Sequence, residues 1–131
     1  MKQILLPIDG SKRSIKSIDL VKSLYSPEQV DVSIIFVLED DGIRSRSDYD
    51  QMKEETMPFL DEAAAKLEGY NVKKYVLAGL PGEEILKFSE SNETDIIIMT
   101  KSTRKGWTQM IGSVTKHVVK YAKCIVMIIP E

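Results

Sequence analysis

Apolar residues gather in five short runs along the chain, separated by longer segments in which polar and charged residues dominate. The runs are rich in β-branched residues and have the length of single strands. Several are almost continuously apolar rather than alternating, which is typical of strands covered on both faces of a parallel sheet. The predicted strands cover residues 4–8, 32–38, 72–78, 96–99 and 124–129.

The segments that follow the first two runs carry apolar residues at helical spacing. A first helix is predicted there, with Asp9 or Ser11 capping its start. A second helix is predicted over residues 49–67, with Phe59 on its core face. Pro58 lies inside this second pattern, and we expect it to kink the helix or to mark where its regular part begins.

Two further helices are predicted in the second half of the chain. Pro81 suits the first turn of the third helix, with Glu83 and Glu84 near the positive end of its dipole. Ser113 is expected to cap the fourth. The alternation of strand and helix predicts an α/β fold, a five-stranded parallel sheet with helices on both faces. We expect one domain over residues 1–131.

Composition narrows the class of protein. The 131 residues include 18 Lys and Arg against 20 Asp and Glu, a net charge of −2, which argues against nucleic-acid binding through counterion release. The apolar fraction of 43% with 29% charged residues fits a folded globular chain, neither disordered nor embedded in a membrane. No apolar run is long enough to span a bilayer and no signal peptide is recognisable, so we expect a cytoplasmic location.

A ligand site is expected where the strand order of such an open sheet reverses, beyond the carboxyl ends of the strands. For the order 3-2-1-4-5, this point lies between the first and fourth strands, next to residues 9–11 and 100–113. The second segment carries three basic side chains and ends in Gly112 and Ser113 at a helix start. Free amides, the helix dipole and the Ser113 hydroxyl favour an anion there, most obviously phosphate. Simple helix capping is the alternative explanation of this Gly-Ser pair.

Little in the sequence supports catalysis or metal binding. Asp9 is the only carboxylate placed securely at the expected site, so a paired-carboxylate mechanism has no second member. His117 is the single histidine and falls on the apolar face of a helix, where a structural role is expected. Cys124, the single cysteine, is expected to be a buried and inert thiol.

Four segments together resemble the universal stress protein family. They are ILLPIDGS at 4–11, AGLPGEEI at 78–85, DIIIM at 95–99, and the stretch from 112 to 130 that ends in CIVMIIP. The resemblance covers essentially the whole chain. It implies the 3-2-1-4-5 order, a Rossmann-like fold of the adenine nucleotide alpha hydrolase-like class, no established enzymatic chemistry, and a homodimer.

Members of that family that bind ATP share a loop pattern, Gly-x2-Gly-x9-Gly-Ser/Thr, after the fourth strand. This chain departs from it, because Thr100 and Thr103 stand where the first two glycines would be. Only eight residues, instead of nine, separate Thr103 from Gly112. Glycine lets the backbone approach a ligand and adopt positive φ, whereas β-branched threonine blocks close approach. We therefore expect a pocket that binds nucleotide with reduced affinity or takes a different ligand.

The resemblance assigns a role to each remaining part of the pocket. Asp9 corresponds to a residue that contacts the nucleoside, Val37 to a position that offers backbone groups to adenine, and Gly112-Ser113 to the phosphate end. The candidate nucleotide-binding residues are Ile8, Asp9, Val37, Thr100, Thr103, Arg104, Gly112 and Ser113. The apolar edge of the last strand is the candidate dimer interface, with residues Ile125, Val126, Met127 and Ile128.

Three functional hypotheses follow from the sequence. The first is a small dimeric regulatory protein of the universal stress type, which requires no cofactor and binds ATP or another adenine nucleotide weakly. The second is a protein-interaction module of the same fold that binds no nucleotide. The third, an enzyme acting on adenylated or phosphorylated substrates, is disfavoured because no base, nucleophile or metal cluster is visible.

Overall fold

Strands and helices alternate along the chain as the apolar pattern predicts. The computed structural model describes residues 1–39, 43–100 and 112–130. In chain order the elements are β1 (Lys2–Ile8), the 3-10 helix η1 (Lys12–Ser14), α1 (Ile15–Leu24), β2 (Val30–Leu38), α2 (Arg46–Ala65), β3 (Asn71–Ala78), α3 (Pro81–Ser91), β4 (Ile96–Thr100), α4 (Ser113–Tyr121) and β5 (Ile125–Ile129).

The five strands form one parallel sheet in the order β3-β2-β1-β4-β5, which confirms the predicted topology. β1 pairs with β2 on one side and with β4 on the other. The strand order therefore reverses between β1 and β4. The carboxyl ends of these two strands are the place where ligands bind in open sheets of this kind.

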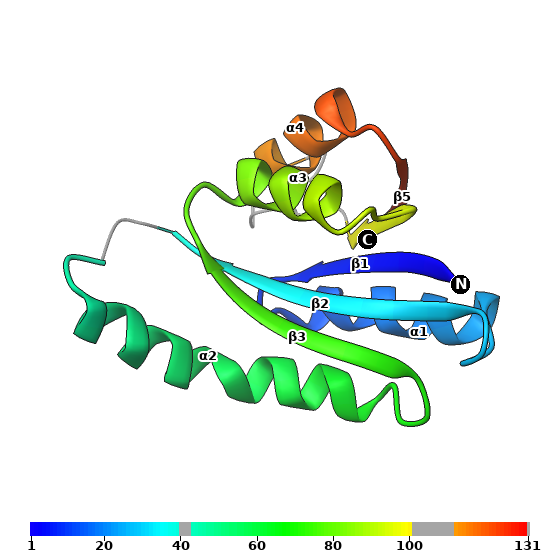
Figure 1. The fold of residues 1–131 in the computed structure, drawn as a ribbon, viewed down its shortest axis with the longest axis horizontal. Helices are drawn as coiled ribbons and strands as arrows, with labels where there is room; N and C mark the ends of the chain where they lie inside the picture. Colours follow the sequence, from blue (N-terminus) through cyan, green and yellow to red (C-terminus); the bar gives the residue numbers. More distant parts are fainter. Residues whose placement is uncertain (40–42, 101–111, 131) are drawn as a thin grey trace.

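Helices cover both faces of the sheet, α1 and α2 on one side and α3 and α4 on the other (Figure 1). Adjacent residues of one strand therefore enter different cores: Ile34 packs in the layer with α1 and α2, and Ile35 in the layer with α3 and α4. This explains why the central strands are apolar at consecutive positions. The edge strands β3 and β5 are more exposed to solvent, so the prediction of strands covered on both faces does not hold for these two.

A polar clasp ties three strands together at their amino ends. The Gln3 amide Nε2 donates to Asp31 Oδ2 at 2.9 Å, and the Asn71 amide Nδ2 donates to Asp31 Oδ1 at 2.8 Å. These hydrogen bonds, that from Gln3 first, hold the pKa of Asp31 below its usual range because they favour the charged carboxylate. The clasp lies at the opposite end of the sheet from the strand carboxyl ends.

Two predictions about helix structure need correction. α2 runs unbroken through Pro58, and it begins at Arg46 because the Ser45 side chain accepts a hydrogen bond from the Asp48 amide at 3.2 Å. Pro58 therefore does not mark the start of the regular helix, and the other expectation, a kink at Pro58, stays a prediction. Gly112, not Ser113, is the N-cap residue of α4, so Ser113 is the first helical residue and does not cap it.

Candidate functional site

The turn after β1 forms the first part of the candidate site. Ile8 ends the strand and is buried, whereas Asp9 is exposed. The Asp9 carboxylate accepts a hydrogen bond from the Ser11 amide at 2.9 Å, and Gly10 between them has a φ of 82°. L-residues rarely adopt this left-handed conformation, so the turn depends on glycine. Asp9 thus stabilises the turn, and the Ser11 side chain makes no cap hydrogen bond.

Two aromatic rings lie against this turn. A Cβ atom added to Gly10 would lie 3.5 Å from the ring of Phe59 in α2 and 3.6 Å from the ring of Phe36 in β2. The two rings stack with centroids 6.2 Å apart and planes 24° from parallel. Phe59 is 44% exposed, so its predicted place on the core face of α2 is wrong. The buried residues of that helix are Thr56, Leu60 and Ala63.

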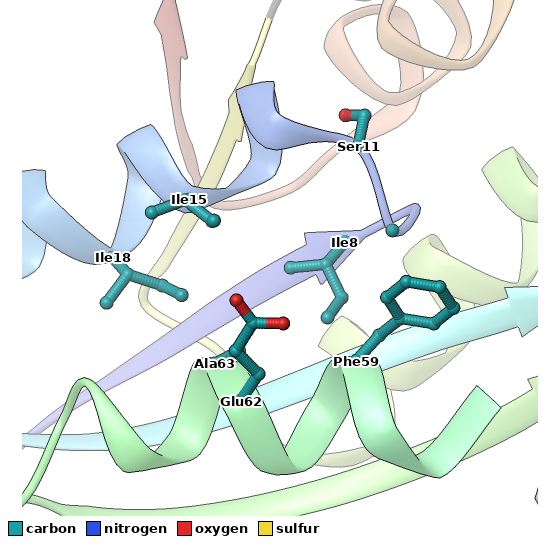
Figure 2. A pocket seen from close by; sticks show the side chains of 8 residues that line it. Ile8, Ser11, Ile15, Ile18, Phe59, Glu62 and Ala63 are labelled. Carbon is teal, nitrogen blue, oxygen red and sulfur yellow. The ribbon is translucent and has the colours of Figure 1, made fainter.

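A small hollow between α1 and α2 lies beside Phe59 (Figure 2). Figure 2 shows Phe59 and Glu62 of α2 on one side of it, with Ile15 and Ile18 of α1 across from them and Ile8 between. The hollow encloses about 30 Å³, which is room for one or two water molecules. It is too small to hold a nucleotide.

The second part of the site begins at the end of β4. The observed register pairs Ile4 with Ile96 and Leu5 with Ile97, so Thr100 falls level with Ile8 at the end of β1. Thr100 is still part of β4 and pairs with Ile129 of β5. Thr103 and Arg104, the other two candidates on this segment, lie outside the described residues.

The first turn of α4 completes this part of the site. Gly112 carries no side chain and so gives the amides of the turn no side-chain cap, and the turn itself contains no acidic residue. By contrast, α2 has both the Ser45 cap and Asp48 in its first turn. No side chain of α4 itself therefore neutralises the positive end of its helix dipole.

Thr115 lies in this turn and was missed by the sequence analysis. It is fully buried at 0% exposure, and its hydroxyl has no hydrogen-bond partner in the described part of the chain. Side chains in a helix lean toward its N-terminus, so the Thr115 side chain lies over the start of α4. An unpaired buried hydroxyl is costly, and an anion bound at the turn would offer it an acceptor.

Val37 lies beyond the last pairing of β1 with β2, because that ladder stops at Ile8 and Phe36. Its own neighbour is Leu77 in β3. The Val37 side chain packs in the core layer with Leu5 and Ile35. The side chain therefore has a packing role, and the predicted contact of its backbone with adenine stays a prediction.

His117 and Cys124 pack against neighbouring side chains, although Cys124 is half-buried and not buried as expected. The His117 ring lies 2.7 Å from the position that a Cβ atom on Gly82 would occupy, and its centroid is 4.9 Å from that of Tyr121. Desolvation, the main cause, raises the pKa of the half-buried Cys124 thiol, which disfavours the reactive thiolate. Among the described residues, no group of three His, Cys, Asp or Glu side chains is placed to hold a metal ion.

β5 lies at the edge of the sheet and pairs only with β4 among the described strands. Ile125 is 59% exposed, and Val126, Met127 and Ile128 are half-buried. The four candidate interface residues thus lie on one exposed strand edge, as predicted; their pairing with a second chain stays a prediction. In the described part of the chain, no helix is both long and apolar enough to cross a bilayer.

Comparison with known proteins identifies a family whose members resemble this chain over nearly its whole length. The model of the universal stress protein family matches residues 1–130. Universal stress protein MJ0531 of Methanocaldococcus jannaschii is 27% identical over 140 residues, which cover 99% of this chain and 82% of that protein. Universal stress protein MJ0577 of the same organism is 25% identical over 152 residues, covering 98% of this chain and 94% of that protein.

Solved structures share the fold. The structure of MJ0577 superimposes with a TM-score of 0.87 at 28% identity, over 99% of this chain and 96% of that one. A universal stress protein from Archaeoglobus fulgidus in complex with dAMP has a TM-score of 0.70 at 17% identity, covering 98% and 96% of the two chains. An Arabidopsis thaliana protein of the universal stress protein family, with AMP bound, has a TM-score of 0.74 at 15% identity, covering 100% and 92%.

Proposed function

Because the chain belongs to the universal stress protein family, we propose that it is a small regulatory protein that binds an adenine nucleotide where β1 and β4 end. The family match covers residues 1–130. The proposal assigns the phosphates to the first turn of α4 and the nucleoside to the turn after β1. It includes no catalytic step and no required cofactor.

The first turn of α4 is the observation that carries this proposal. It combines an N-cap glycine that offers no side-chain cap, a first turn without a carboxylate, and the buried Thr115 hydroxyl, which has no partner among the described residues. Each of these features favours an anion at the same end of the helix. The 3-10 helix η1 lies beside β4, where the strand order reverses, and α4 is the helix that follows β4 in the chain.

The nucleoside end rests on Asp9 and Val37. Asp9 is exposed at the turn after β1, and Val37 extends past the end of the β1 ladder. The ligands of the two solved relatives, dAMP and AMP, share an adenine base joined through a pentose to a phosphate. A ligand of that chemistry would reach from these two residues to the first turn of α4.

We expect the affinity to be weak, about 10 μM or poorer, which corresponds to roughly 7 kcal/mol of binding free energy or less. The reason is Thr100, which continues β4 and pairs with Ile129 where nucleotide binders of the family have a glycine. Its β-branched side chain keeps the backbone from approaching a phosphate closely. The proposal also includes a cytoplasmic location and a homodimer joined through β5.

A charge placed in the first turn of α4 tests the phosphate assignment. In Ser113→Asp, the new carboxylate should stabilise the free protein by about 0.3–1 kcal/mol, because it complements the helix dipole. The same charge should repel a phosphate and weaken ATP binding about tenfold or more in titration calorimetry. Ser47→Asp, in the first turn of the capped helix α2, is the matched control and should leave the affinity unchanged.

The two results that contradict the proposal are distinct. If the unmodified protein gives no binding heat with millimolar ATP or AMP, the nucleotide proposal is wrong, and the interaction module without nucleotide replaces it. If ATP binds and Ser113→Asp binds it equally well, the phosphates do not lie at α4.

A further inference from the structure

We propose that the half-exposed ring of Phe59 in α2 stacks on the purine base and so selects a nucleotide over other phosphates. This inference rests on the proposed nucleotide function and adds a specificity-determining residue to it. Phe59 belongs to a helix on the α1 and α2 face of the sheet, whereas the phosphates are assigned to α4 on the other face (Figure 1). The bound nucleotide would therefore lie across the carboxyl end of β1.

The position of Phe59 connects both halves of the nucleoside end. Its ring lies beside Gly10, where an added Cβ atom would meet it at 3.5 Å, and Gly10 follows Asp9 directly in the chain. It also stacks on Phe36, which directly precedes Val37. The two residues assigned to the nucleoside are thus each the immediate chain neighbour of a residue that lies beside the Phe59 ring.

The ring is already held in place. Phe36 supports it at a centroid distance of 6.2 Å with planes 24° apart, and the turn at Gly10 lies beside both rings. An aromatic side chain that is fixed before binding loses little conformational entropy when it meets a ligand. Although packed against the turn, Phe59 keeps 44% of its surface exposed to solvent.

Stacking explains a preference for a base better than the other contacts do. The hollow beside Phe59 is too small to enclose a base, so a purine must lie on an open surface there. An aromatic ring binds the π-face of any base, and removing such a ring usually weakens binding by about tenfold. The first turn of α4, in contrast, recognises only the phosphate charge and cannot distinguish a nucleotide from an inorganic polyphosphate.

The test compares ATP, AMP and inorganic tripolyphosphate by titration calorimetry. Phe59→Leu keeps an apolar side chain but removes the ring, so it should weaken ATP and AMP binding by the same factor, about tenfold, and leave tripolyphosphate unchanged. Phe59→Trp keeps an aromatic face and should retain the affinity. Tyr121→Leu removes a half-exposed ring at the far end of α4 and should change none of the three affinities.

Direct contact is measured by NMR on the unmodified protein with AMP, where nuclear Overhauser effects should join Phe59 ring protons to adenine H2 or H8. This measurement also decides the question if Phe59→Leu fails to fold. The inference is overturned, while the nucleotide proposal stands, if ATP binds and a folded Phe59→Leu keeps the parent affinity. It is likewise overturned if tripolyphosphate binding falls equally, or if no such contact is seen. Failure of the parent to bind any nucleotide overturns both.

Discussion

Replacing Thr115 by valine should stabilise the free protein and weaken nucleotide binding at the same time. The two side chains have nearly the same shape, and Thr and Val have similar helix propensities. Thr115 is completely buried, and its hydroxyl has no partner in the described part of the chain, so valine removes the cost of that unpaired group. This cost is about 1–3 kcal/mol.

The size of both effects follows from this geometry. A gain of about 1 kcal/mol raises the melting temperature of a domain of this length by roughly 3–5 °C. If the hydroxyl donates to a phosphate oxygen, its loss removes a hydrogen bond to a charged group, which lowers ATP affinity about tenfold or more. An affinity near 10 μM would then fall to about 100 μM.

The assay combines urea unfolding of the free protein with calorimetric titration of ATP. Thr56→Val is the matched control, because the Thr56 hydroxyl donates to the Met52 carbonyl at 2.7 Å and is therefore paired. This control should lose about 1 kcal/mol of stability and keep the ATP affinity. A loss of stability in Thr115→Val would show that its hydroxyl has a partner in solution. Unchanged ATP affinity would show that the hydroxyl does not serve the nucleotide.

Three further predictions concern the fold and its edge. The Asp31 pKa is lowered, so its contribution to stability is complete above its ordinary pKa of about 4 and is lost as pH falls through the lowered value. Asp31→Asn should therefore be less stable than the parent at pH 7, and denaturant unfolding should show this difference in stability vanishing in acid. A difference that does not change with pH would contradict the role of the Asp31 charge. Gly82→Ala should lower the free energy of unfolding in urea by about 1–3 kcal/mol, because the new Cβ meets the His117 ring at 2.7 Å. Adding His117→Ala to the same chain should recover most of this loss, and an unchanged stability of Gly82→Ala would refute the clash. Val126→Lys should convert a dimer to a monomer or to aggregates in light scattering, whereas a parent protein already at 14.8 kDa argues against the β5 interface.

The sheet was predictable because its signals are local and repeated. The strands β1, β2 and β4 are apolar at consecutive positions, and only a sheet covered on both faces accommodates that pattern. Pro81 at the first position of α3 was equally clear, since proline has a specific place in helix starts. Both features depend on residues that are close together in the sequence.

The parts that the sequence did not predict depend on packing between distant segments. Phe59 has the spacing of a core residue, and only the meeting of α2 with the β1 turn at Gly10 shows that it is half-exposed beside the candidate site. Thr115 could be read as an ordinary helical residue until its burial without a partner was known. The α4 cap was assigned one residue too late, because glycine can serve as an N-cap without a side-chain hydrogen bond.

Backbone amide shifts in NMR would show whether an adenine nucleotide binds across the carboxyl ends of β1 and β4. Titration of ¹⁵N-labelled protein with ATP should give saturable shifts at Gly10, Val37 and Ser113 to Thr115. The amides of Asp31 and Asn71, in the clasp at the opposite end of the sheet, should not move. No saturable shift up to millimolar ATP, or shifts confined to the clasp, would contradict the account.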